Sequence, residues 1–274
     1  MGSQSPGNRT VSQVDSLLEQ VKVRLFGLAV DAASFDQAVE QLVTAAMQRG
    51  GAARVVVTPN VDHLVRLDGA PEFRERYSQA DFIFADGMPV VWASRLLGRP
   101  LPERVTGADL FDALCREAQQ RHLKILLLGG QPGSEPQLLE SFSHTYAGLD
   151  IEIVSPSMQF DPTGPEGESF ARLARERAPD IVFLCVGMPK QEQWALHYAS
   201  QLPGGIVLCV GAAMEFAIGM QRRAPQWMQS AGLEWLWRLV NNPRRLWRRY
   251  LVDDPKFLRL CWREWRARMR HGEA

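Results

Sequence analysis

Short apolar runs, many of them β-branched, alternate with longer amphipathic segments through most of the chain. The predicted strands are 23–28, 54–58, 82–84, 124–128, 151–154, 181–186 and 206–210. Several of these runs are apolar throughout, which is typical of strands that are covered on both faces. The longer segments predict helices over 35–48, 88–97, 108–121, 135–146, 166–177 and 190–200. This alternation predicts an α/β fold with a mostly parallel, Rossmann-like sheet flanked by helices.

The charge of the chain divides it into a body and a tail. The whole sequence is neutral, but residues 222–274 carry 13 Lys and Arg against 5 Asp and Glu, together with six of the eight tryptophans. Arginine interleaved with tryptophan suits a surface that is partly apolar and partly anionic, such as a membrane interface. The alternative is a solvated basic helix that packs a few tryptophans on the body. We therefore expect a basic, Trp-rich helical appendage at 222–274 that associates with membranes.

The rest of the domain organisation follows from composition. Residues 21–221 form the predicted α/β domain, and the polar segment 1–20 is predicted to be disordered and not a secretory signal. No apolar run approaches the roughly 20 residues of a transmembrane helix. The four cysteines are far apart and show no metal-binding spacing. The sequence therefore predicts a cytoplasmic protein that is peripheral on the inner face of the membrane.

Polar, glycine-bearing turns follow most of the predicted strands, and parallel sheets bind ligands at that edge. Asp86 ends the run Phe82–Ala85 and is followed by Gly87. A carboxylate in this position can act as a general base toward a hydroxyl nucleophile. The alternative is that Asp86 caps the next helix.

Three further segments are candidates for contacts with phosphate. Gly129 and Gly130 open a turn in which backbone N–H groups can approach an anion, although an ordinary tight turn explains them as well. Lys190 can reach a phosphate and Gln191 can bind a hydroxyl, or both can simply begin a helix. Arg104 can clamp a diphosphate, or form a surface salt bridge.

Together these segments resemble the WecG/TagA/CpsF family of bacterial glycosyltransferases. The resemblance covers about residues 23–260 in the right order. The matching stretches are 58–60 (TPN), 85–91 (ADGMPVV), 103–110 (ERVTGADL), 186–192 (VGMPKQE), 223–227 (RAPQW), 232–239 (GLEWLWRL) and 243–252 (PRRLWRRYLV).

The resemblance implies an inverting, metal-independent enzyme. It would move a sugar from a UDP-sugar to a polyprenyl-diphosphate-linked saccharide at the cytoplasmic membrane face, in surface polysaccharide biosynthesis, with no cofactor. The absence of any Asp-x-Asp pattern agrees with this implication. The donor sugar, the acceptor saccharide, the linkage and the oligomeric state, including a homo-oligomer, are left open.

The resemblance also implies roles for particular residues. Asp86 would be the base, and an acidic residue near the nucleoside would be Glu215, where the family more often has Asp. The remaining substrate contacts implied are Thr58, Asn60, Arg104 and Gln191 in the pocket and Arg238, Arg245 and Arg248 in a mobile tail that completes the site.

Two rival interpretations were weighed. A doubly wound oxidoreductase would carry G-x-G-x-x-G after the first strand, but Ala29-Val30-Asp31 stands there. A non-catalytic protein that binds anionic lipid or a nucleotide through the basic tail is the alternative function. This alternative does not explain why polar residues follow most of the predicted strands. No nucleic acid is expected as a partner.

Overall fold

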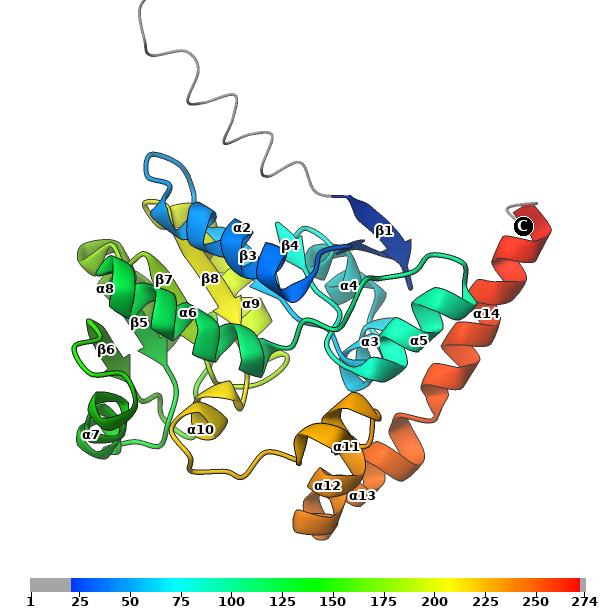
Figure 1. The fold of residues 1–274 in the computed structure, drawn as a ribbon. Helices are drawn as coiled ribbons and strands as arrows, with labels where there is room; N and C mark the ends of the chain where they lie inside the picture. The colour runs from blue at the N-terminus through cyan, green and yellow to red at the C-terminus, as the bar shows by residue number, and fades with distance from the viewer. Residues whose placement is uncertain (1–20, 272–274) are drawn as a thin grey trace, which may run out of the picture.

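The computed structural model describes residues 21–271 (Figure 1). Its centre is a sheet of six parallel strands in the order β4–β3–β8–β7–β5–β6. The strands are β3 (Arg54–Val57), β4 (Phe82–Ile83), β5 (Ile125–Leu128), β6 (Ile151–Val154), β7 (Ile181–Leu184) and β8 (Ile206–Cys209). The predicted α/β class with a parallel sheet is confirmed.

Helices cover both faces of the sheet because successive strand residues point to opposite sides. Val56 packs in one core cluster, and its neighbours Val55 and Val57 pack in the other. The first cluster includes α2 (Phe35–Met47), α6 (Gly107–Arg121), α7 (Glu135–Thr145) and α10 (Ala213–Ala217). The second includes α3 (Val61–Asp68), α4 (Pro71–Tyr77), α5 (Met88–Leu96), α8 (Pro165–Arg177) and α9 (Lys190–Tyr198). The result is a three-layer α/β/α domain.

The strand order changes direction at β3. The chain passes from β3 to the edge strand β4, whereas the later strands β5 to β8 all lie on the other side of β3. Such a switch point leaves a crevice at the carboxyl ends of the strands, where α/β proteins bind ligands. The turns after β3 and β4 lie at this position.

The strand predicted at 23–28 is confirmed over residues 23–25, but it is not a single strand, because a turn at 26–27 interrupts it. The chain forms an antiparallel hairpin there, β1 (Lys22–Leu25) and β2 (Leu28–Asp31), with Phe26 and Gly27 both at positive φ in the turn. Two central residues at positive φ give the tight turn that matches strand twist. Asp31 then joins the hairpin to the main sheet, because its Oδ2 accepts a hydrogen bond from the backbone N–H of Ile83 at 2.6 Å.

The tail is helical, as predicted, and it is divided into several short helices followed by one longer helix. The first part of the tail forms two short helices, α11 (Gln226–Ser230) and α12 (Glu234–Asn241). Gly232 separates them with φ +67°. They are followed by α13 (Pro243–Arg248), a π-helical turn (Arg249–Asp253) and α14 (Lys256–His271).

The tail packs against the body. Figure 1 shows α11–α13 together and α14 extending away along the side of the molecule. Phe257 and Leu260 of α14 are buried in the same core cluster as the hairpin and α3. In residues 21–271, no helix is both long enough and apolar enough to cross a bilayer. The segment predicted to be disordered, 1–20, lies outside the described residues.

Candidate active site

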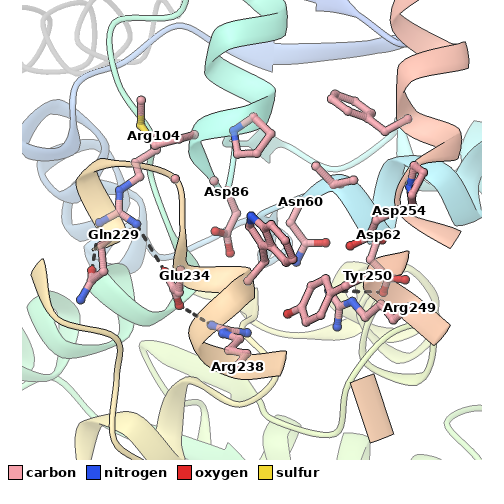
Figure 2. Close-up of a pocket in the computed structure, with 18 of the residues that line it drawn as sticks. Asn60, Asp62, Asp86, Arg104, Gln229, Glu234, Arg238, Arg249, Tyr250 and Asp254 are labelled. Atoms are coloured by element: carbon pink, nitrogen blue, oxygen red, sulfur yellow. Dashed lines mark hydrogen bonds and ion pairs between the residues drawn. The ribbon is translucent and has the colours of Figure 1, made fainter. Parts of the chain in front are cut away.

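A cavity of about 420 Å³ lies where the tail meets the carboxyl ends of β3 and β4 (Figure 2). The body contributes Asn60 and Asp62 after β3, Asp86 after β4, and Arg104 from the loop before α6. The tail residues that line it are Gln229, Gly232, Glu234, Trp235, Arg238, Arg249, Tyr250, Asp254, Pro255, Phe257 and Leu258. The cavity is therefore built jointly by the body and the tail.

Asp86 is half-buried and faces the middle of this cavity (Figure 2). Its backbone N–H donates to the carbonyl oxygen of Pro59 at 3.1 Å, which ties the β4 turn to the β3 turn. Helix α5 has Gly87 as its N-cap and no side-chain cap hydrogen bond, so Asp86 does not cap it. The capping alternative is therefore wrong.

The electrostatic environment of Asp86 is mixed. Burial raises the pKa of its carboxyl to about 6, and the Glu234 carboxylate adds to the rise. The guanidinium groups of Arg238, Arg104 and Arg223 act in the opposite direction. At pH 7 the carboxylate is mostly ionised, yet it is more basic than an ordinary aspartate. Such a group suits a general base.

Arg104 and Arg238 converge on Glu234 at one end of the cavity. Arg238 Nη2 donates to Glu234 Oε1 at 2.6 Å, and Arg104 Nη1 lies 3.7 Å from Glu234 Oε2. Arg104 Nη2 also donates to Gln229 Oε1 at 3.1 Å. The surface salt bridge weighed for Arg104 is thus an ion pair in the cavity wall.

A third arginine anchors the start of the tail to the body. Arg223 Nη2 donates to Thr106 Oγ1 at 3.2 Å and to Asp109 Oδ2 at 3.1 Å. Thr106 is the N-cap of α6, and its Oγ1 accepts from the backbone N–H of Asp109. The first turn of α6 is thereby linked to the segment that enters α11.

The opposite end of the cavity contains a second charged group. Arg249 Nη2 lies 3.5 Å from Asp62 Oδ2, and Tyr250 and Asp254 line the wall beside them (Figure 2). Asn60 lies in the cavity as predicted. It also caps α3, because its Oδ1 accepts from the backbone N–H of His63 at 3.1 Å.

Gln191 and Thr58 are buried and do not line the cavity. The Gln191 amide oxygen accepts from the backbone N–H groups of Gly187 and Gly211, at 3.2 and 3.0 Å. Its amide nitrogen donates to Glu192 at 2.9 Å. Gln191 therefore fastens the turns after β7 and β8 to each other. Thr58 is buried against the start of α6.

Packing accounts for the two glycines after β5. A Cβ on Gly129 would lie 2.6 Å from Cys185 Cβ. Gly130 has φ +87°, and a Cβ there would lie 2.6 Å from Leu138 Cδ1. The turn also closes on itself, since Ser134 Oγ accepts from the N–H of Gln131. These contacts agree with the alternative that Gly129 and Gly130 form an ordinary tight turn. Phosphate binding by this turn stays a prediction.

Four other predicted site residues do not line the cavity. Lys190 is half-buried at the first position of α9. Glu215 is half-buried on α10 and accepts a hydrogen bond from Gln221. Arg245 and Arg248 are exposed on α13. Their roles in substrate binding stay predictions.

Arg223, Glu234 and Arg249 contribute to the site but were not predicted as site residues from the sequence. Arg249 begins the π-helical turn, which shifts the face that each following residue presents. The resemblance instead implied a role for its neighbour Arg248, which is exposed and does not line the cavity. Glu234 lies in the stretch 232–239, which matches the family. Its pairing with Arg104 and Arg238 could not be predicted from that match, because the pair with Arg104 forms only in the folded chain.

A half-buried carboxylate with a raised pKa at the edge of a parallel sheet can accept a proton from a hydroxyl, and nearby arginines can stabilise an anionic leaving group. This arrangement is typical of group-transfer enzymes. Across residues 21–271, no group of three His, Cys, Asp or Glu side chains is placed to hold a metal ion.

Comparison with known proteins identifies the family. The model of the glycosyl transferase WecG/TagA/CpsF family matches residues 23–271, and the chain belongs to this family of glycosyltransferases. It is 30% identical over 211 residues to an N-acetylglucosaminyldiphosphoundecaprenol N-acetyl-beta-D-mannosaminyltransferase of Bacillus spizizenii, covering 77% of this chain and 79% of the relative. A protein of the same name from Staphylococcus aureus is 27% identical over 254 residues, covering 89% and 94%. The predicted family and enzyme class are confirmed.

Proposed function

We propose that this enzyme transfers a sugar from a UDP-sugar to a saccharide carried on polyprenyl diphosphate, in the synthesis of a cell-surface polymer. The observation that carries the proposal is Asp86, a basic carboxylate in a cavity whose arginines come from both body and tail. The names of the relatives support the acceptor class, because they describe transfer to a diphosphoundecaprenol-linked sugar.

The proposed reaction is a single displacement at the anomeric carbon. Asp86 takes the proton from the acceptor hydroxyl while its oxygen forms the new bond to that carbon. The bond to UDP breaks on the opposite face, so the anomeric configuration inverts. The leaving diphosphate gains negative charge, and nearby guanidinium groups such as those of Arg104 and Arg238 can offset it.

Metal independence is part of the proposal. The sequence has no Asp-x-Asp pattern, and arginines take the place that a divalent cation would have beside the diphosphate. EDTA in the assay tests this directly.

The membrane location is also proposed, and the shape of α14 supports it. Leu258, Trp262, Trp265 and Met269 are exposed and recur at helical spacing along one face. Arginines lie between them in the sequence, while Phe257 and Leu260 on another face are buried in the body. A basic helix with an exposed Trp-bearing stripe suits the interface of an anionic membrane. Because Leu258 also lines the cavity, this stripe begins at the active site.

The test is release of UDP from a panel of UDP-sugars, with a short-chain polyprenyl-diphosphate saccharide as acceptor and EDTA present. Acceptor-dependent release with one donor would support the proposal and identify the sugar. No release with any donor, from protein shown to be folded, would count against it. Direct UDP binding without transfer would then favour the non-catalytic alternative.

A further inference from the structure

Glu234 is the acidic residue of the cavity that pairs with both Arg104 and Arg238. It is the first residue of α12, and its two carboxylate oxygens face two different arginines. Oε1 pairs with Arg238 on the same helix at 2.6 Å, and Oε2 lies 3.7 Å from Arg104, which comes from the body. Figure 2 shows both pairs beside Asp86. One carboxylate thus bridges the two parts of the chain at the site.

The side chains of Glu234, Arg104 and Arg238 are partly shielded from solvent, which strengthens the ion pairs between them. The side chains of Glu234 and Arg104 are each 20% exposed, and that of Arg238 is 35% exposed. Interactions at such positions are screened less than those of surface ion pairs. Glu234 therefore helps to hold the two guanidinium groups in place beside Asp86, together with Gln229 and Asp109, which also contact Arg104.

The charges around Asp86 explain how Glu234 would affect the basicity of the Asp86 carboxylate. The groups that interact electrostatically with Asp86 are Arg238 and Glu234 of α12, Arg104 before α6, Arg223 before α11, and the Tyr77 hydroxyl of α4. Three cations beside one carboxylate would make it a weak base, because each of them favours its ionised form. Glu234 offsets part of this positive charge.

We propose that Glu234 is a positioning residue that orients Arg104 and Arg238 around the base and keeps that base strong enough to accept the proton of the acceptor hydroxyl. This inference rests on the proposed sugar transfer. Glu234 belongs to the tail, so the basicity of Asp86 would depend on the tail being packed against the body.

The test is the pH dependence of kcat for Glu234→Gln, a change that keeps the shape and removes the charge. We expect kcat at neutral pH to fall about tenfold, because a weaker base accepts a proton less readily. We also expect the acid limb of the pH profile to move to lower pH, since the arginines then act on Asp86 without opposition. Glu264→Gln removes a carboxylate of α14 that pairs with Arg99 at 3.7 Å, outside this cavity. This control should leave both quantities unchanged.

Two results would overturn the inference. One is a Glu234→Gln enzyme with the kcat and acid limb of the wild type. The other is a lower kcat with the acid limb unmoved, which would show a merely structural role. Thermal unfolding of both variants checks that they fold. Wild-type enzyme that fails to release UDP with any donor would instead contradict the proposed function, so the two failures are distinguishable.

Discussion

The ring of Phe257, on α14, packs against the ring of Phe26, in the turn of the β1–β2 hairpin, with centroids 5.2 Å apart. Both side chains are buried, and they join the C-terminal helix to the start of the chain. Because these rings belong to the core of the body, the base of α14 is an integral part of the fold.

The first prediction concerns this contact. Phe257→Ala should lower the free energy of unfolding by about 3 kcal/mol, since it leaves a cavity between the hairpin and α14. Urea unfolding of the full chain measures the change. The neighbouring Leu258 is 72% exposed, so Leu258→Ala should change stability by less than about 0.5 kcal/mol. Equal effects of the two substitutions would show that α14 is not anchored in this way.

The second prediction concerns the break between α11 and α12. Gly232 has φ +67°, and a Cβ there would lie 2.5 Å from Trp92 Cη2. Gly232→Ala should therefore push α12 away from α5, displace Glu234 and Arg238, and lower kcat about tenfold. Gly219 is a matched control, because its φ is +74° but no atom lies within 4 Å of an added Cβ.

Gly219→Ala should show only the destabilisation that backbone strain produces, roughly 1 kcal/mol, with kcat retained. Parallel measurements of kcat and of unfolding in urea separate strain from displacement. If both alanine variants keep full turnover, the contact with Trp92 does not position α12.

The third prediction concerns stability and pH. Glu192 is fully buried, and burial raises the pKa of its carboxyl to about 7. One of its oxygens, Oε2, has no hydrogen-bond partner in the structure. The folded state binds this proton more tightly than the unfolded state, so its stabilising effect is complete at low pH and is lost as pH rises through about 7.

Glu192→Gln should remove that dependence and retain the hydrogen bond from Gln191. Relative to this variant, the wild type should lose about 3 kcal/mol of unfolding free energy between pH 4.5 and pH 8. Urea unfolding at the two pH values measures the difference. A constant difference across this range would mean that the carboxyl titrates normally.

The fourth prediction concerns the exposed stripe of α14. Replacing Trp262 and Trp265 together by Ser should weaken binding to anionic lipid vesicles by about tenfold or more, because interfacial binding scales with buried apolar area. Co-sedimentation with vesicles gives the affinity. Met158 is 75% exposed on the body, so Met158→Ser should leave binding unchanged. If the wild type and both variants bind the vesicles equally, the stripe on α14 does not contact the membrane.

The sequence predicts the layers of this fold well, because buried parallel strands leave continuous apolar runs such as 125–128 and 181–184. It fails at the hairpin, where Phe26 at positive φ lies inside an apolar run and hides the turn. It also fails at Gly232, where the helix breaks although both sides look helical. Both features are fixed by tertiary packing, which a local pattern does not contain.

The candidate site shows the same division. Asp86, Asn60, Arg104 and Arg238 are found because they follow strands or lie in recognisable motifs, and the structure gathers them around one cavity. Arg249 is missed because the resemblance implied its neighbour Arg248, whereas the structure places Arg249 in the cavity wall. The packing of Gly129 against Cys185 is equally invisible in the sequence, because the two residues are brought together only by strand order.

The most direct test of the account is acceptor-dependent UDP release by Asp86→Asn, compared with wild type and with Asp36→Asn, which removes an exposed carboxylate of α2. Wild-type turnover should fall as pH falls through about 6, where Asp86 takes up its proton. We expect Asp86→Asn to lose at least about 100-fold in kcat while it still binds the UDP-sugar. Near wild-type turnover by this variant would contradict the assignment of Asp86 as the base.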